Sequence, residues 1–96
     1  MDNYILDGKV AKPIGNILEW AKWYEGADRI VKKTKLPNHV EVSTVFLGLD
    51  HSFGNGKPLL FETMVFGGEY DQHTERYSTY EEAEKGHDEV INLIFS

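Results

Sequence analysis

VEVSTVFLGL, from Val40 to Leu49, and PLLFETMVF, from Pro58 to Phe66, are the two most apolar segments of the chain. Both are rich in β-branched and aromatic residues and are bounded by turn-forming residues, a pattern typical of antiparallel strands. We therefore expect a long β-hairpin over Val40 to Phe66, closed by a wide loop from Asp50 to Lys57. Proline has no N–H for a strand ladder, so Pro58 supports the wide loop.

The number of residues in this connection decides which side chains share a face, since side chains alternate along a strand. Asn55-Gly56 favours an even number, because this pair is typical of a two-residue turn. An even number would place the Glu62 carboxylate among apolar side chains, and burying it there would cost several kcal/mol of folding free energy. We therefore predict an odd number. The drier face then holds Val45, Leu47, Leu49, Leu59, Phe61, Thr63 and Val65. The opposite, mixed face holds Thr44, Phe46, Gly48, Asp50, Leu60, Glu62, Met64 and Phe66.

The remaining segments predict two helices and further short strands. In the first helix, Ile17, Trp20, Ala21 and Tyr24 form one apolar stripe. The second helix begins with two overlapping capping boxes, Ser78 with Glu81 and Thr79 with Glu82. Its packing side holds Ala83, Val90, Leu93 and Ile94, and Gly86 is its weak point. The expected segments are an edge hairpin over Tyr4 to Pro13, a helix over Gly15 to Gly26, an edge strand over Arg29 to Thr34, a strand over Gln72 to Tyr77, and a helix ending at about Phe95.

Together these segments indicate one α+β domain over residues 1–96, with an antiparallel sheet of three to five strands and two helices. If both helices cover the layer of Val45, Leu47 and Phe61, the layer of Phe46, Met64 and Phe66 is left partly open. Such a surface usually marks an interface, often with a second copy of the chain, so we expect a homo-oligomer.

Composition excludes several classes of function. The chain has 10 Lys and Arg against 16 Asp and Glu, a formal charge of −6 that disfavours nonspecific binding to nucleic acid or to anionic membranes. It has no cysteine, which excludes disulfides, thiolate catalysis and a cysteine-based zinc site. No signal peptide or membrane-spanning run is recognisable, so we expect a cytoplasmic protein.

Three charged residues form the candidate binding site. With a symmetric connection after Phe66, Met64 faces Thr74 and Glu62 faces Arg76 across neighbouring strands, and Phe66 faces Gln72. Asp50, Glu62 and Arg76 would then gather on the open face, where they would hold a polar ligand or a cation or perform acid–base chemistry. The structural alternative is that Glu62 and Arg76 only pair and that Asp50 caps the loop. The full set of proposed binding residues is Trp23, Thr44, Phe46, Asp50, His51, Glu62, Met64 and Arg76.

Catalytic and metal motifs are missing from the sequence. Asp50, His51 and Glu62 are the donors that a metal-assisted hydrolase would use, but no HExxH or paired i, i+4 ligands accompany them, and we assign no metal, cofactor or catalytic residue. His39 is expected in a turn and His87 on an exposed helical face. Trp23 lies off the centre of the first helix's stripe, which suggests a role beyond the core.

Several segments resemble a family of short proteins encoded by tailed phages and prophages. They are LEWAKWYE at Leu18 to Glu25, VSTVFLGLDH at Val42 to His51, PLLFETMVFGG at Pro58 to Gly68, and RYSTYEEA at Arg76 to Ala83. The resemblance implies a genomic setting rather than a reaction. We therefore expect a non-enzymatic accessory protein that binds a host protein or a small nucleotide signal, with an anti-defence role. The alternatives are a small metal-assisted hydrolase and a structural homodimer or virion component.

Overall fold

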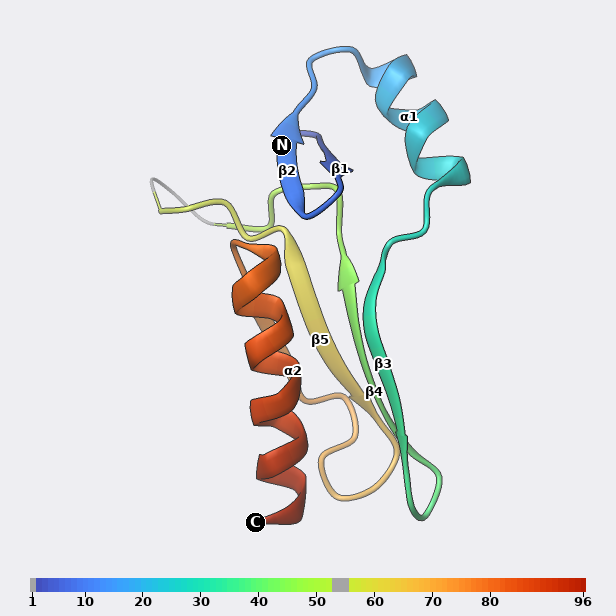
Figure 1. Cartoon of the computed structure of the whole chain (residues 1–96), viewed down its shortest axis with the longest axis vertical. Coiled ribbons are helices and arrows are strands. Elements are labelled where there is room, and N and C mark those ends of the chain that lie inside the picture. Colours follow the sequence, from blue (N-terminus) through green and yellow to red (C-terminus); the bar gives the residue numbers. More distant parts are fainter. Residues whose placement is uncertain (1, 53–55) are drawn as a thin grey trace.

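The computed structural model describes residues 2–52 and 56–96, which form an α+β fold of two antiparallel sheets and two helices (Figure 1). The tip of the loop predicted over Asp50 to Lys57 therefore lies partly outside the described residues. The elements are β1 (Tyr4–Asp7), β2 (Val10–Pro13), α1 (Ile17–Gly26), β3 (Ile30–Leu36), β4 (Val40–Phe46), β5 (Phe61–Phe66), β6 (Thr74–Tyr77) and α2 (Tyr80–Phe95). No helix among these residues is long and apolar enough to cross a membrane.

The main sheet has the order β3-β4-β5-β6, so each strand pairs with its neighbour along the chain. The central hairpin predicted from the apolar segments is confirmed as β4 paired with β5. The predicted edge strand is confirmed as β3, whose pairing with β4 is interrupted by a bulge between Ile30 and Lys32. β1 and β2 form the predicted small hairpin, and Figure 1 shows it with α1 at the end of the sheet remote from the C-terminus.

The predicted register of the central hairpin is wrong. Val42 pairs with Val65, Phe46 with Phe61 and Val45 with Glu62, which corresponds to an even connection. The odd arrangement keeps Glu62 out of the dry layer but places Glu41 in that layer. The even arrangement puts both carboxylates on the uncovered face, where water can reach them and where Lys33 and Arg76 pair with them.

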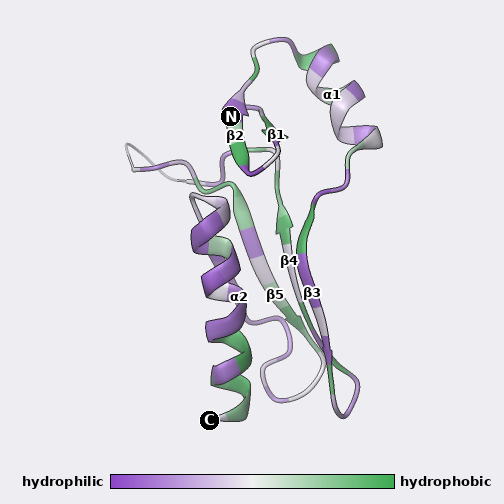
Figure 2. Cartoon of the chain, viewed as in Figure 1, coloured by the Kyte–Doolittle hydropathy of each residue, from purple (hydrophilic) through white to green (hydrophobic). Residues whose placement is uncertain are grey.

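Within the described chain only α2 covers the main sheet, so the arrangement in which both helices cover one layer is not the one found. Ala83, Gly86, His87 and Val90 are its buried residues, and its contacts extend to all four strands. Its start is the predicted capping box of Thr79 and Glu82, in which each side chain accepts from the other residue's backbone N–H. Figure 2 shows that the C-terminal turns of this helix are its more hydrophobic part.

The helix α1 instead packs at the end of the sheet. Trp20 Nε1 donates to the carbonyl oxygens of Tyr4 and Gly48, at 3.0 and 3.2 Å. Gly48 has a φ of +79°, and a Cβ there would lie 3.1 Å from the ring of Tyr24. Glycine at this position therefore permits both the left-handed backbone and the close approach of α1.

The core consists of two clusters under α2. One is built on Phe46, Leu60, Phe61 and Ala83, and Tyr4, Leu6, Trp23 and other half-buried side chains pack against it. The second is built on Val42, Val65 and Val90, with Ile94 at its margin. Leu93, expected on the packing side of α2, is 37% exposed instead.

Candidate binding surface on the uncovered face of the sheet

The face of the main sheet opposite α2 is covered by no element of the described chain. Burial alternates along the two central strands: Val42, Thr44 and Phe46 are buried, whereas Glu41, Ser43 and Val45 are only partly so. We call this second set, with its cross-strand partners, the open face. Its residues are Ile30, Lys33, Lys35, Glu41, Ser43, Val45, Glu62, Met64, Phe66, Thr74 and Arg76.

Two cross-strand ion pairs flank the centre of the open face. Glu62 faces Arg76 as predicted, and Arg76 Nε donates to Glu62 Oε2 at 3.0 Å. The Glu62 side chain is only 15% exposed, so its carboxylate depends on this partner for hydrogen bonding. On the other side, Lys33 Nζ lies 3.5 Å from Glu41 Oε1. Met64 faces Thr74, which confirms a second predicted pair.

Apolar side chains occupy the space between and beside these ion pairs. Ile30 and Phe66 are 52% and 47% exposed, and Val45 and Met64 are half-buried. The face carries three cationic and two acidic side chains, a balance of +1 in a chain of formal charge −6. The open face therefore combines exposed apolar surface with a charge that is not acidic.

Two residues predicted on the open face lie on the other side of the sheet. Thr44 and Phe46 are fully buried, so their predicted placement is wrong. Phe46 packs edge-on against Trp23, with ring centroids 5.8 Å apart, and tilts against Phe61 at 5.2 Å. Trp23 thereby joins the packing of the first core cluster. The cause is again the even connection, which moves every side chain of β4 relative to β5.

The Asp50 carboxylate is used inside the chain. Its Oδ1 accepts from the backbone N–H groups of Ser52 and Leu59, at 2.8 and 3.0 Å, and so holds the two ends of the β4–β5 connection together. These hydrogen bonds, that from Ser52 first, lower the pKa of Asp50 below its usual value. An ionised, doubly bonded carboxylate suits a loop anchor rather than a general acid.

The structure does not assemble a metal site from the donors considered above. The His51 backbone N–H donates to the Leu59 carbonyl, which keeps this residue in the ladder beside Asp50. Within residues 2–52 and 56–96, no three His, Asp or Glu side chains converge on a point where a metal ion could sit. Asp50, His51 and Glu62 therefore lack the shared geometry that a metal-assisted hydrolase requires.

The prediction for His87 is wrong. This residue, expected on an exposed helical face, is fully buried on the side of α2 that faces the sheet. Its Nδ1 lies 2.7 Å from Thr44 Oγ1 and its Nε2 2.9 Å from Thr34 Oγ1, and Thr44 Oγ1 in turn contacts Thr63 Oγ1. Burial lowers the pKa of His87, with Lys32 adding to the effect and Asp88 opposing it.

This position could have been found in the sequence. His87 follows Ala83 by four residues and precedes Val90 by three, so it lies on the stripe that was used to orient the helix. The imidazole of His87 links α2 to β3, β4 and β5 through the hydroxyl groups of Thr34, Thr44 and Thr63. In its neutral form it gives these hydroxyl groups hydrogen-bond partners without burying a charge.

Comparison with known proteins adds no further constraint. A scan against protein-family models, a search of curated proteins and a search of solved structures each returned no match.

Proposed function

We propose that this protein is a non-enzymatic phage or prophage accessory protein that binds a host protein through the open face. The observation that carries the proposal is a sheet face with exposed Ile30 and Phe66 around ordered ion pairs and no covering element in the described chain. Apolar area framed by paired charges is typical of protein–protein interfaces. The phage setting and the cytoplasm of the host as the site of action are supported by the resemblance of the sequence.

The shape of this face favours a protein partner over a nucleotide signal. Small ligands are usually held in concave pockets that enclose most of their surface. None of the main hollows in the described residues is lined by Val45, Glu62, Met64 or Arg76. The centre of the open face therefore suits a flat protein surface better than a small molecule. The hollow of about 600 Å³ at the β3–β4 turn is lined by Lys35 and Glu41 at the margin of this face and otherwise by residues outside it.

The proposal is tested by capture from lysate of an infected host with three versions of the protein. Phe66→Asp places a charge at the exposed apolar part of the open face and should abolish retention of the partner. Leu18→Asp makes the same chemical change at a residue 77% exposed on α1 and should retain it. A captured protein that ignores both substitutions, or that is lost with both, would rule out the open face as its binding site.

A second copy of the chain is the alternative occupant of the open face, and the accessible surface of the molecule is large enough for either partner. The radius of gyration is 14.1 Å, against about 12.5 Å expected for a compact domain of this length. The accessible surface is 6294 Å², roughly 700 Å² above the expectation for this mass. That excess approaches the ~800 Å² which each partner contributes to a standard interface.

Light scattering coupled to gel filtration separates the two occupants. A homodimer through the open face should become monomeric in Phe66→Asp and stay dimeric in Leu18→Asp. A wild-type monomer at high concentration would exclude self-association and leave the face to a host protein.

A further inference from the structure

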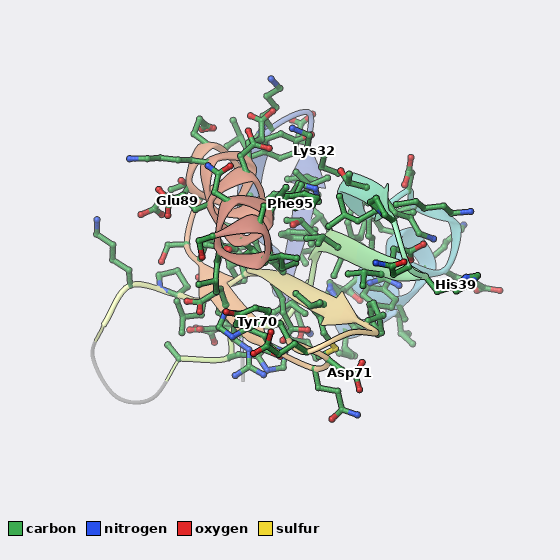
Figure 3. The ribbon with its side chains drawn as sticks, turned by 90° about the horizontal axis from the view of Figure 1, so that it is seen from below. Lys32, His39, Tyr70, Asp71, Glu89 and Phe95 are labelled. Atoms are coloured by element: carbon green, nitrogen blue, oxygen red, sulfur yellow. The ribbon has the colours of Figure 1, made fainter. Side chains whose placement is uncertain are left out.

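A groove runs between the edge strand β6 and the flank of α2, away from the open face. On the strand side the lining residues are every second residue from 73 to 77, which share one face of the strand. On the helix side they lie three, four and seven positions after Gly86 and share one face of α2. The groove has a volume of about 240 Å³. Its lining residues are His73, Glu75, Tyr77, Gly86, Glu89, Val90 and Leu93. Figure 3 looks along α2 and shows Glu89 on the opposite flank from Lys32.

Gly86 sets the depth of the groove near the start of α2. A Cβ at this position would lie 2.2 Å from the Tyr77 ring, so only glycine lets the ring pack against the helix backbone. The glycine that weakens the helix by propensity therefore brings α2 close to β6. Further along, the two elements are separated by longer side chains, and Leu93 is left 37% exposed.

The strand beside the groove has a free hydrogen-bonding edge. Among the described residues, β6 is the last strand of the sheet and pairs with β5 alone. The Val65 N–H donates to the His73 carbonyl and the Leu60 N–H donates to the Tyr77 carbonyl, so the carbonyls of His73 and Tyr77 face β5. In such a ladder the pairs alternate, so the N–H and C=O groups of Thr74 and Arg76 point away from β5. This edge has no lysine and no proline, the residues that usually discourage pairing with another strand.

The groove is acidic in its middle and apolar at its far end. The pKa of Tyr77 is raised above its ordinary value, mainly by burial. The Thr63 hydroxyl opposes this rise, and the negative charges of Glu75 and Glu89 add to it. Glu75 Oε2 lies 2.8 Å from His73 Nε2, so this carboxylate already has a partner on the strand side of the groove. Lys85 is the lysine along this flank of α2 among the described lining residues, and its Nζ lies 3.9 Å from Glu89 Oε1. Val90 and Leu93 supply the apolar end next to His73.

From the free edge and the charge of the groove, we infer that β6 binds an extended basic peptide segment as an additional strand. The peptide backbone bonds to the outward groups of Thr74 and Arg76. One basic side chain then lies at the level of Glu75 and Glu89, and an aliphatic side chain two residues away lies against Leu93, since β6 and α2 run in opposite directions. Strand addition of this kind obtains affinity from the backbone and specificity from alternate side chains.

Fluorescence anisotropy at low ionic strength tests this with three short labelled peptides. The first carries an arginine and a leucine two residues apart among threonines. The second replaces the arginine with glutamate, and the third keeps the arginine but is N-methylated at the ladder positions. We expect the first to bind saturably and each of the others to bind at least about tenfold more weakly. Absence of saturation by about 1 mM, or equal binding of the acidic peptide, would overturn the inference.

Matched variants of the full chain locate the peptide. Glu89→Lys should weaken binding about tenfold, whereas Glu84→Lys, the same change elsewhere on α2, should alter it by less than about threefold. Lys85→Gln removes the cation beside Glu89 and should tighten binding. Phe66→Asp should have no effect, so loss of the proposed host partner and loss of the peptide are separate results. If Phe66→Asp abolishes peptide binding or Glu89→Lys leaves it unchanged, the groove is not the site.

Discussion

The helix α2 buries Ala83, Gly86, His87 and Val90 against the main sheet, whereas α1 has no buried residue. α2 is also capped by a reciprocal pair of hydrogen bonds, while α1 has the Asn16 side chain alone at its start. The first helix is held by Trp20 and by stacking between Arg29 and the Tyr24 ring, whose centroid lies 4.0 Å from the guanidinium carbon. An apolar stripe is thus present in both helices, but only α2 contributes buried residues, whereas α1 reaches the margin of the core through half-buried Trp23.

This difference teaches that the two helices contribute unequally to the free energy of unfolding. Substitutions in α2 act on close packing and on buried polar groups, which are the sites of large effects. Substitutions in α1 act on a partly exposed contact at the end of the sheet. The following predictions begin with those for which the difference between the helices is greatest.

The largest expected effect is at His87. His87→Ala should lower the free energy of unfolding by about 3 kcal/mol, because it leaves a cavity and removes hydrogen bonds from Thr34 and Thr44. Chemical denaturation with a constant m-value measures this. His39→Ala, a histidine change in an exposed turn, is the control and should cost little. Equal stability of the two variants would mean that the buried network does not support α2.

A comparison of two glycines isolates the packing of each helix. Gly86→Ala should destabilise the protein by about 2 kcal/mol, since the new methyl group meets the Tyr77 ring. Gly26→Ala in α1 meets no atom within 4 Å and should be neutral or stabilising by up to about 1 kcal/mol. Thermal unfolding of both variants gives the measurement.

Combining Gly86→Ala with Tyr77→Ala tests the cause of that loss. Since the smaller side chain removes the clash, the cost of the glycine substitution should largely disappear in the Tyr77→Ala background. If the two losses simply add, the ring is not what requires glycine at this position.

The pH dependence of stability should reveal the buried imidazole. The pKa of His87 is lowered by burial from the ordinary 6.5, so the unfolded chain binds a proton more readily than the folded one. Stability from this group is complete above pH 6.5 and is lost as the pH falls below it. The carboxylates of Asp50 and Asp88, whose pKa values are lowered from 3.8, contribute to a separate loss at lower pH.

Denaturation curves of the wild type and His87→Gln between pH 7 and 5 measure this effect, which is smaller than that of the alanine substitution. We expect the slope of stability against pH in this window to become flatter in the variant. An unchanged slope would assign the pH dependence to other groups.

The smallest effects are expected in α1. Trp20→Phe keeps an aromatic side chain but removes the indole N–H that donates to Tyr4 and Gly48, and should cost about 1 kcal/mol. Leu18→Ser, at a residue 77% exposed, should stay within about 0.5 kcal/mol of the wild type. A larger loss for Leu18→Ser would contradict the exposed position of this side chain on α1.

Much of the fold was predictable because its signals are local. The central hairpin, the edge strand β3 and the capping box of α2 follow from β propensity, turn residues and Thr79 with Glu82. The pair of Glu62 and Arg76 was also predictable, since the short connection between β5 and β6 determines which residues meet. Of the candidate binding residues, Glu62, Met64 and Arg76 lie on the open face as expected.

The errors have two origins. Thr44 and Phe46 were assigned to the open face from the parity of a long connection, which local turn chemistry does not determine. Glu41 argues for the even connection, because the odd connection would bury its carboxylate in the dry layer. His87 was judged by its polarity alone, although its spacing from Ala83 and Val90 placed it on the buried stripe.

By itself, the sequence determined which segments become strands and helices, where α2 begins, and the acidic character of most of the surface. Only the tertiary structure decided which face of the sheet α2 covers, that α1 lies apart from it, and that the β6 edge and α2 enclose a groove. The physical reason is that propensity and capping act within a few residues. Burial of a face depends instead on contacts between distant segments, and a change of one residue in register exchanges the buried and exposed sides of a strand.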